Sequence, residues 1–159
     1  MNIDDLFPLN RILIDEVYQS RKRALEVLAG LLADDQLGGA HATHIFELLI
    51  ERERLGCTAI GRGIAIPHSR DKDILRPRGA VIRLNEGIDF GADDNQPVSL
   101  IIGLIVSEEC PESHLKMLGL LAQHLSNDED RDAIMNTQSP ERIRGLMREW
   151  LSELATTDD

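Results

Sequence analysis

The sequence predicts a three-layer α/β sandwich, in which helices cover both faces of a mixed central β-sheet. Three observations indicate this fold. Segments with apolar residues at helical spacing stand toward both ends of the chain, two apolar β-branched runs lie between them at 79–84 and 97–106, and the second run is nearly uninterrupted. A strand that is apolar at successive positions is covered on both faces, so helices are expected on each side of the sheet.

The length and composition fit one globular domain. The chain has 159 residues, and a domain commonly holds roughly 100–200 residues. We therefore expect a single domain over 1–159, with a core over about 6–152 and a short frayed C-terminal tail. Hydrophobic residues make up 42% and charged residues 28%, which is typical of a soluble globular protein.

The sequence shows no targeting signal or membrane span, and it has only two cysteines. The first five residues lack the basic start of a signal peptide, and no apolar run approaches the ~18–20 residues that a membrane span needs. We therefore expect a cytoplasmic protein that is not embedded in a membrane. The two cysteines, Cys57 and Cys110, are too few for a disulfide framework or a zinc cage, so both are expected to be reduced.

Charge is unevenly distributed along the chain. The net charge of −11 argues against nonspecific nucleic-acid binding, because Lys and Arg carry affinity for the phosphate backbone. Between Glu51 and Arg78, however, seven basic residues stand against four acidic ones. This segment is suited to an anionic partner, although scattered solvated charges would give the same count.

Two amphipathic helices are predicted in the N-terminal part. The first spans 20–34, with Ser20 as its N-cap, and Gly38 and Gly39 end this helical segment. The second spans about 43–54 and buries apolar residues up to Leu49, with Leu55 as a further candidate for burial and Gly56 as its stop. Arg52 lies on the polar face of this second helix.

The central segment predicts short strands and turns. From 57 to 68, two glycines flank Arg62 ahead of a short apolar run that Pro67 closes. This pattern indicates a tight turn followed by a strand that ends at His68. The strands predicted at 79–84 and 97–106 are joined by a turn-rich connection over 87–97.

Three more helices are predicted after the last strand. The first follows Pro111, and its expected apolar face is made of Leu115, Leu118, Leu121, Ala122 and Leu125. A shorter helix is expected near 129–135. The last begins at Pro140, which suits the first helical position after Ser139, and runs through Leu151.

The sequence lacks the common motifs of nucleotide-binding and hydrolytic enzymes, so its five histidines are the first candidates for chemistry. His41 and His44 stand at a predicted helix entrance, where solvated side chains are expected. His124 stands late in a helix, where a cation suits the helix dipole. His68 and His114 are the two that a structural role does not readily explain.

His68 ends a short strand, directly after Pro67, within the basic segment. A neutral imidazole is a competent nucleophile toward phosphorus, and the fork of an arginine matches phosphoryl oxygens. Arg52, on the preceding helix, is placed to fold back beside His68. His114 opens the helix that follows the long strand, where it either orients His68 or bonds a phosphoryl oxygen, or simply faces water at a helix start.

The stretch from Arg52 to His68, which ends in Ile66-Pro67-His68, closely resembles the active-site signature of the fructose/mannitol-type enzyme IIA family of the bacterial phosphotransferase system. The segments 20–25 and 94–98 and the helix start at His114 are similar to its nitrogen-regulatory branch. The resemblance covers most of the chain and implies the fructose/mannitol-type enzyme IIA fold.

The resemblance also implies roles for the candidate residues. His68 would accept a phosphoryl group on its Nε2 (tele) atom from the phosphohistidine of an HPr-like phosphocarrier protein. Arg52 would stabilise the phosphoryl oxygens, and His114 would orient His68 or hydrogen-bond the phosphoryl group. The transfer it implies uses no nucleotide, no cofactor and no metal.

Three residues depart from the family pattern or have no assigned role. Cys57 stands where the family often has serine, and Ser69 stands where glycine is common. A serine at position 69 would change loop flexibility or hydrogen bonding to the phosphoryl group. No role follows for Arg62, between its two glycines.

Two function classes follow from the resemblance. In the first, the protein is a signalling component whose phosphorylation state controls binding to regulatory targets such as transporters or kinases. In the alternative, it is a sugar-specific enzyme IIA that passes the group to an enzyme IIB domain for fructose- or mannitol-type uptake. No fused IIB, IIC or HPr-like segment is present in the sequence, which favours regulation. A third class, a small-molecule binding domain of similar appearance, would show no phosphorylation.

Overall fold

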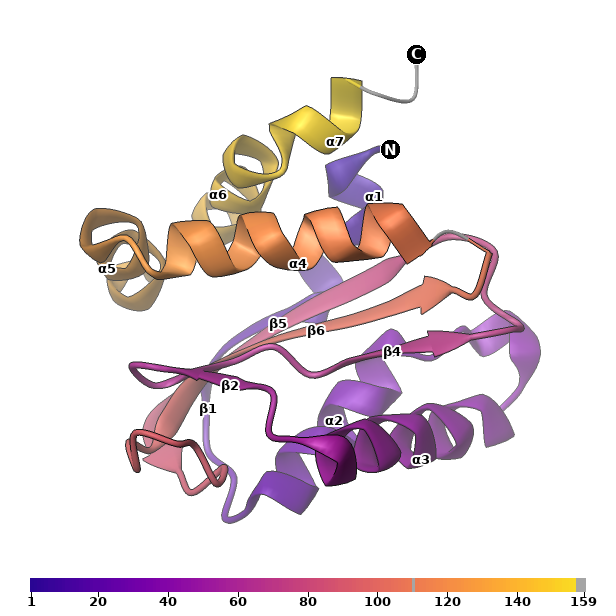
Figure 1. Cartoon of the computed structure of the whole chain (residues 1–159), viewed down its shortest axis with the longest axis horizontal. Coiled ribbons are helices and arrows are strands. Elements are labelled where there is room, and N and C mark those ends of the chain that lie inside the picture. Colours follow the sequence, from indigo (N-terminus) through magenta and orange to yellow (C-terminus); the bar gives the residue numbers. More distant parts are fainter. Residues whose placement is uncertain (110, 157–159) are drawn as a thin grey trace.

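The computed structural model describes residues 1–109 and 111–156, and it confirms the three-layer α/β sandwich with a mixed sheet. Figure 1 shows the sheet between two helical layers. On one side lie α2 (Arg21–Leu32) and α3 (Ala40–Leu55). On the other side lie α4 (Pro111–Leu125), α5 (Asp128–Asn136) and α6 (Pro140–Trp150), together with the short helices α1 (Ile3–Leu6) and α7 (Ser152–Thr156).

The sheet has six strands. They are β1 (Ile12–Glu16), β2 (Ala59–Gly61), β3 (Ile64–Ala65), β4 (His68–Asp71), β5 (Arg78–Ile88) and β6 (Val98–Ser107). Their order is β1-β5-β6-β3-β2, and β4 also pairs with β6. Strand β6 runs antiparallel to β5 and parallel to β3 and β4, so these three strands pair with it directly.

Strands β3 and β4 follow one another along the same edge of β6, and Pro67 lies in the gap between them. Ala65 pairs with Ile101, and His68 pairs with Leu104. Proline has no N–H to donate, but its carbonyl still accepts a hydrogen bond from the N–H of Leu104 at 3.0 Å. The interruption therefore keeps the register, and His68 is fixed at the start of β4.

Two hydrophobic cores lie on opposite faces of the sheet. Side chains of β6 alternate between them: Leu100, Ile102 and Leu104 enter the core beneath α4 and α6, whereas Ile101 and Ile105 enter the core beneath α2 and α3. This alternation is the physical reason for the unbroken apolar run in the sequence. Ile3 and Leu154 are buried as well, so the packed region extends slightly beyond the expected bounds of 6 and 152.

Three predicted helix boundaries are confirmed, whereas α2 ends at Leu32, ahead of the expected Gly38 and Gly39. Ser20 accepts a hydrogen bond from the N–H of Arg23, and Ser139 accepts one from the N–H of Arg142, as N-caps do. Gly56 ends α3. Strand β1 and the short helix α1 were not anticipated, because neither has enough length or alternation to stand out in the sequence.

Two predictions of apolar burial are wrong. Leu55 is 86% exposed, since it lies at the end of α3, and Leu115 is 64% exposed. The buried face of α4 instead follows Met117, Leu121 and Leu125, which recur every four residues, and Leu115 falls outside that stripe.

Two expectations concern residues outside the described part of the chain: that Cys110 is reduced, and that the C-terminal tail at 157–159 is frayed. Cys57 is a free thiol, as expected. Within the described part of the chain, no helix combines the length and hydropathy that crossing a membrane requires.

Candidate functional site

Three residues far apart in the sequence, Arg52, His68 and His114, line one open pocket of about 340 Å³. Arg52 comes from the last turn of α3, His68 begins β4, and His114 lies in the first turn of α4. The remaining lining residues are Ser69, Arg70, Leu115 and Leu118. The sheet therefore brings together the three side chains that the sequence singled out.

One hydrogen bond fixes the tautomer of His68. Its Nδ1 lies 2.7 Å from the carbonyl oxygen of Ile66. A carbonyl oxygen can only accept, so Nδ1 carries the proton and donates, and the lone pair of the neutral ring resides on Nε2. Nε2 is therefore the nucleophilic atom of this side chain.

The surroundings of His68 keep its ring neutral. Burial lowers the pKa of His68 below its ordinary value, the hydrogen bond to Ile66 opposes this, and the positive charge of Arg52 lowers the pKa further. At neutral pH the imidazole is therefore unprotonated at Nε2 and available to attack an electrophile.

The end of α3 is anchored beside this ring. The Nη1 of Arg52 donates a hydrogen bond to the carbonyl of Gly56 at 2.8 Å. The neighbouring Glu53 is buried and accepts hydrogen bonds from the N–H of Thr58, at 3.2 Å, and from the Thr58 hydroxyl. Sequence reasoning did not assign a role to Glu53. Its bonds join the helix end to the following turn and so fix the backbone that carries Arg52.

His114 is buried beside His68. Only 4% of the residue is exposed, which excludes the alternative of a helix-start histidine facing water. The two ring centroids are 5.3 Å apart. Burial, followed by the charges of His68 and Arg70, lowers the pKa of His114 to about 4, so its ring is neutral. Its Nδ1 has no hydrogen-bond partner among the described residues, which is uncommon for a buried polar atom.

Arg70 also lines the pocket, although in the sequence it stood out only as one of the seven basic residues between Glu51 and Arg78. It follows His68 by two positions in β4, and alternate residues of a strand lie on the same face. That spacing was the available signal. Arg52 and Arg70 make the pocket positive, and none of the described lining residues is acidic. The site therefore favours an anion.

The unexplained Arg62 has a structural role. It occupies the turn between β2 and β3 with a φ of 58°, and its N–H donates to Asp94 Oδ2 at 2.8 Å. Its guanidinium donates to the carbonyl of Ser126 and to Asp128 Oδ1, both at 3.2 Å. Arg62 thus connects the β2–β3 turn to the start of α5 and to the segment before it.

The two departures from the family pattern leave the backbone of the site intact. Ser69 pairs with Ile105 in the β4–β6 ladder, and its φ is not positive, so the position does not need glycine. The thiol of Cys57 donates to the carbonyl of Phe90 at 3.3 Å. Cys57 therefore belongs to the turn after α3 and does not line the pocket.

The remaining histidines differ in their surroundings. The Nδ1 of His124 lies 2.8 Å from Asp130 Oδ2, and its ring stacks on Trp150. His44 is partly exposed. The expectation that His41 is solvated is wrong: α3 begins at Ala40, so His41 lies within the helix, is buried, and contacts a buried carboxylate.

Comparison with known proteins identifies close relatives. The family model described as "Phosphoenolpyruvate-dependent sugar phosphotransferase system, EIIA 2" matches residues 5–150. A nitrogen regulatory protein of Klebsiella oxytoca is 36% identical over 156 residues, which cover 94% of this chain and 95% of that protein. A nitrogen regulatory protein of Escherichia coli is 40% identical over 126 residues, covering 79% of this chain and 76% of that protein.

Solved structures agree with this similarity. The crystal structure of nitrogen regulatory protein IIA-Ntr from Neisseria meningitidis superposes with a TM-score of 0.85 at 37% identity, over 91% of this chain and 98% of that one. The enzyme IIAMtl structure from Escherichia coli, solved in complex with phosphorylated enzyme IIBMtl, has a TM-score of 0.73 at 21% identity over 91% of this chain and 99% of that chain. The second likeness concerns the fold alone.

Proposed function

The chain belongs to the EIIA 2 family of the phosphoenolpyruvate-dependent sugar phosphotransferase system, and from that premise we propose that it is a phosphoryl-accepting regulator of the nitrogen branch, with His68 as the acceptor. Relatives of 36–40% identity that are called nitrogen regulatory proteins support the branch. The observation that carries the residue assignment is the His68–Ile66 hydrogen bond, which leaves Nε2 as a free nucleophile inside an arginine-lined pocket.

The transfer is an exchange between two imidazoles. The lone pair of His68 Nε2 attacks the phosphorus of a phosphohistidine on an HPr-like carrier, and the phosphorus–nitrogen bond of the carrier breaks. The bonding electrons return to the carrier's ring nitrogen, which becomes neutral as the His68 ring becomes positive. No proton has to move, because Nδ1 of His68 keeps its proton on the Ile66 carbonyl throughout.

The other side chains of the pocket stabilise the phosphoryl group in transit. Arg52 and Arg70 supply guanidinium donors for its equatorial oxygens. His114, in the first turn of α4, has a neutral ring with one N–H to donate, and an added phosphoryl oxygen would give that buried ring an acceptor. The N-terminus of α4, which is the positive end of its helix dipole, lies on the same side of the pocket as His114.

Phosphorylation would change the charge that a partner meets at this face. It adds about −1.5 to −2 charges at neutral pH. These charges enter a pocket lined by two arginines, and none of its described lining residues is acidic. Partners that recognise the positive pocket would lose affinity, and partners that recognise an anion would gain it. On this proposal the carrier is an HPr-like protein, the targets are regulated transporters or kinases, and the setting is the cytoplasm.

The alternative, a sugar-specific enzyme IIA, also has a specific observation in its favour. The "PTS system fructose-specific EIIA component" of Haloferax volcanii is 30% identical over 149 residues, which cover 93% of this chain and 96% of that protein. The nitrogen regulatory relatives are more similar in sequence, so the regulatory function is the better supported of the two.

A phosphoryl-chase experiment separates these functions. The protein is labelled from a phosphorylated HPr-like carrier, separated from it, and mixed with a fructose-type enzyme IIB domain. We expect one phosphoryl group to be accepted and then retained through the chase. Rapid passage of the label to enzyme IIB would favour the sugar-specific alternative. Failure to accept label from any HPr-like carrier would overturn the proposal and favour the small-molecule binding domain.

A further inference from the structure

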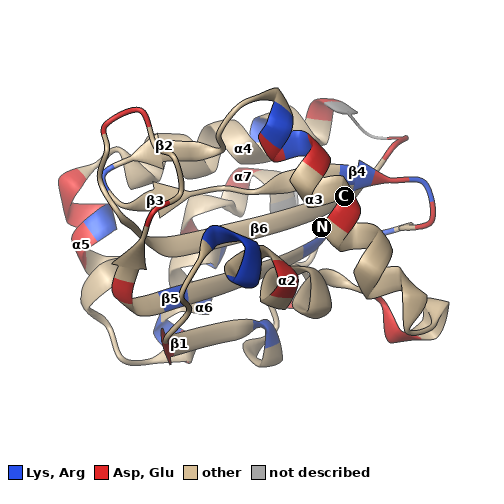
Figure 2. Cartoon of the chain, turned by 90° about the horizontal axis from the view of Figure 1, so that it is seen from below, with Lys and Arg blue, Asp and Glu red and all other residues tan. Residues whose placement is uncertain are grey.

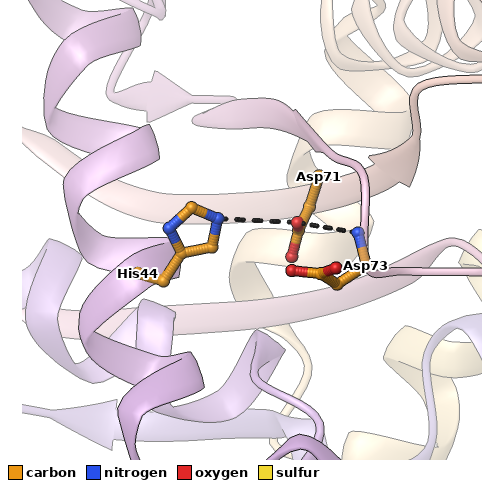
Figure 3. Close-up of side chains that lie close together, drawn as sticks. All are labelled: His44, Asp71 and Asp73. Atoms are coloured by element: carbon orange, nitrogen blue, oxygen red, sulfur yellow. Dashed lines mark hydrogen bonds and ion pairs between the residues drawn. The ribbon is translucent and has the colours of Figure 1, made fainter.

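A second cluster of chemically competent side chains lies away from the His68 pocket. It comprises His44 near the start of α3, Asp71 at the end of β4, and Asp73 in the turn that follows (Figure 3). His44 and Arg52 are eight residues apart on α3, which corresponds to about 12 Å along the helix axis. One ligand atom from each of the three cluster residues lies within 4.8 Å of the others.

Asp71 places a negative charge inside the protein. Its side chain is completely buried. Its carboxylate accepts hydrogen bonds from the N–H of Asp73 at 3.0 Å and from His41 Nε2 at 2.7 Å, and hydrogen bonds of this kind favour the ionised form. Among the described residues no lysine or arginine forms an ion pair with Asp71, and the side chains that face its carboxylate are the imidazoles of His41 and His44. A buried charge is ordinarily paired with a cation or bound to a metal.

His41 holds this carboxylate in one orientation. The Nδ1 of His41 accepts a hydrogen bond from the N–H of Asp34 at 2.9 Å, so the proton of the neutral ring is on Nε2. Nε2 donates to Asp71 Oδ2 at 2.7 Å. The other oxygen, Oδ1, faces His44. An outer partner of this kind commonly orients the carboxylate ligands of metal sites.

The spacing of the donor atoms suits a tetrahedral ion. His44 Nε2 and Asp71 Oδ1 are 3.5 Å apart. Two ligands at about 2.0–2.2 Å from a tetrahedral ion are separated by about 3.4 Å, so these two atoms already form one edge of such a site. His44 is partly exposed and Asp73 is exposed, so solvent reaches this side of the cluster and a water molecule could complete the coordination.

We propose that His44, Asp71 and Asp73 bind a divalent transition-metal ion of the Zn²⁺ type, with His41 as a positioning residue. An imidazole ligand favours Zn²⁺, Ni²⁺ or Cu²⁺ over Mg²⁺ and Ca²⁺, which prefer all-oxygen sites. The ion would neutralise the buried charge of Asp71. It would also tie α3 to the end of β4, the two elements that carry Arg52 and His68 at their other ends.

Zinc titration of the chelator-treated full chain tests this proposal. Isothermal titration with Zn²⁺ gives the stoichiometry and the dissociation constant, and Co²⁺ substitution gives a visible absorption spectrum that reports a tetrahedral site. We expect one ion per chain, with no displacement by millimolar Mg²⁺. His44→Gln and Asp73→Asn should each raise the dissociation constant about tenfold or more and abolish the Co²⁺ spectrum, because each removes a ligand. His41→Gln should weaken binding about 10–100-fold while retaining the spectrum.

Two control variants complete the experiment. His124→Gln removes a different histidine–aspartate pair, and His68→Ala removes the proposed phosphoryl acceptor; both should bind the ion with unchanged affinity. The His68→Ala result separates failure of the metal site from failure of the proposed function. Absence of binding in the unmodified chain would overturn the proposal and leave a His44–Asp71 ion pair in its place. Unchanged affinity in both His44→Gln and Asp73→Asn would also overturn it, because the ion would then be bound elsewhere.

Discussion

The carbonyl of Ile66 decides which nitrogen of His68 can react. The motif Ile66-Pro67-His68 pointed to His68 in the sequence. Which of its two ring nitrogens carries the lone pair depends on the Ile66 carbonyl oxygen, which lies 2.7 Å from Nδ1. Pro67 has no N–H, so one hydrogen bond of the strand ladder is missing just before His68. The imidazole of His68 folds back onto the carbonyl of Ile66. The sequence therefore pointed to His68 as the candidate, whereas its tautomer required the folded backbone.

Arg52→Lys should slow phosphoryl acceptance about tenfold or more with little loss of stability. Lysine keeps the positive charge but cannot present two parallel N–H donors to a phosphoryl group. Rates of acceptance from a phosphorylated carrier would be compared with midpoints of urea unfolding. Arg54→Lys, on the same helix turn but not in the pocket lining, is the matched control and should react normally. An unchanged rate in Arg52→Lys would remove Arg52 from the site.

His114 should make the fold less stable in acid. Its pKa is about 4 in the folded state, below the ordinary histidine value of 6.5. Between these values the unfolded chain binds a proton that the folded chain does not, so stability falls as the pH falls, by about 1.4 kcal/mol per pH unit. The effect is absent above about pH 6.5 and complete below about pH 4.

Urea unfolding of the unmodified chain and of His114→Gln at pH 7 and pH 5 measures this contribution. Going to pH 5, the unmodified chain should lose about 2 kcal/mol more stability than the variant, because glutamine does not titrate. Equal losses in both proteins would mean that His114 is not the group that titrates abnormally in the fold.

Among the secondary-structure elements, β5 depends on a close contact with the segment after α1. A Cβ on Gly79 would lie 2.7 Å from Cζ of Phe7, whose ring is fully buried. Gly79→Ala should therefore destabilise the protein by about 1–3 kcal/mol, as overpacking of a rigid core does. The free energy of unfolding in urea measures this effect.

A helical glycine provides the matched control for this substitution. Gly119 lies in α4, and no atom is within 4 Å of an added Cβ. Gly119→Ala should stabilise the protein by about 0.5–1 kcal/mol, because alanine favours a helix more than glycine does. If both substitutions changed stability in the same direction, the close contact of Gly79 with Phe7 would not explain its effect.

At the scale of elements, the sequence predicted those with strong local signals. The caps at Ser20 and Ser139 and the unbroken apolar run of β6 each have a local cause, so their positions followed from pattern alone. Leu55 and Leu115 were misplaced because helical spacing marks an apolar residue without showing where the sheet ends. The burial of His41 depends on Asp71, thirty residues away, and no local pattern contains that information.

At the scale of the whole molecule, a positive pocket lies on an acidic chain. The net charge is −11, yet the lining of the His68 pocket holds Arg52 and Arg70, and none of its described residues is acidic. Figure 2 shows Lys and Arg interspersed with Asp and Glu around β4 and the turn that follows it. The local excess of basic residues was visible in the sequence between 51 and 78. The position of His114 beside His68 required the fold, because α4 returns to β4 only after β6 is complete.

The measurement that tests the central claim most directly is intact-mass spectrometry after incubation with a phosphorylated HPr-like carrier. The unmodified chain, His68→Ala and His124→Ala would be compared under the same conditions. We predict one acid-labile phosphoryl group on the unmodified chain and on His124→Ala, and none on His68→Ala, whose circular dichroism should remain that of the folded protein. A His68→Ala chain that still gains a phosphoryl group would contradict the assignment of His68 as the acceptor.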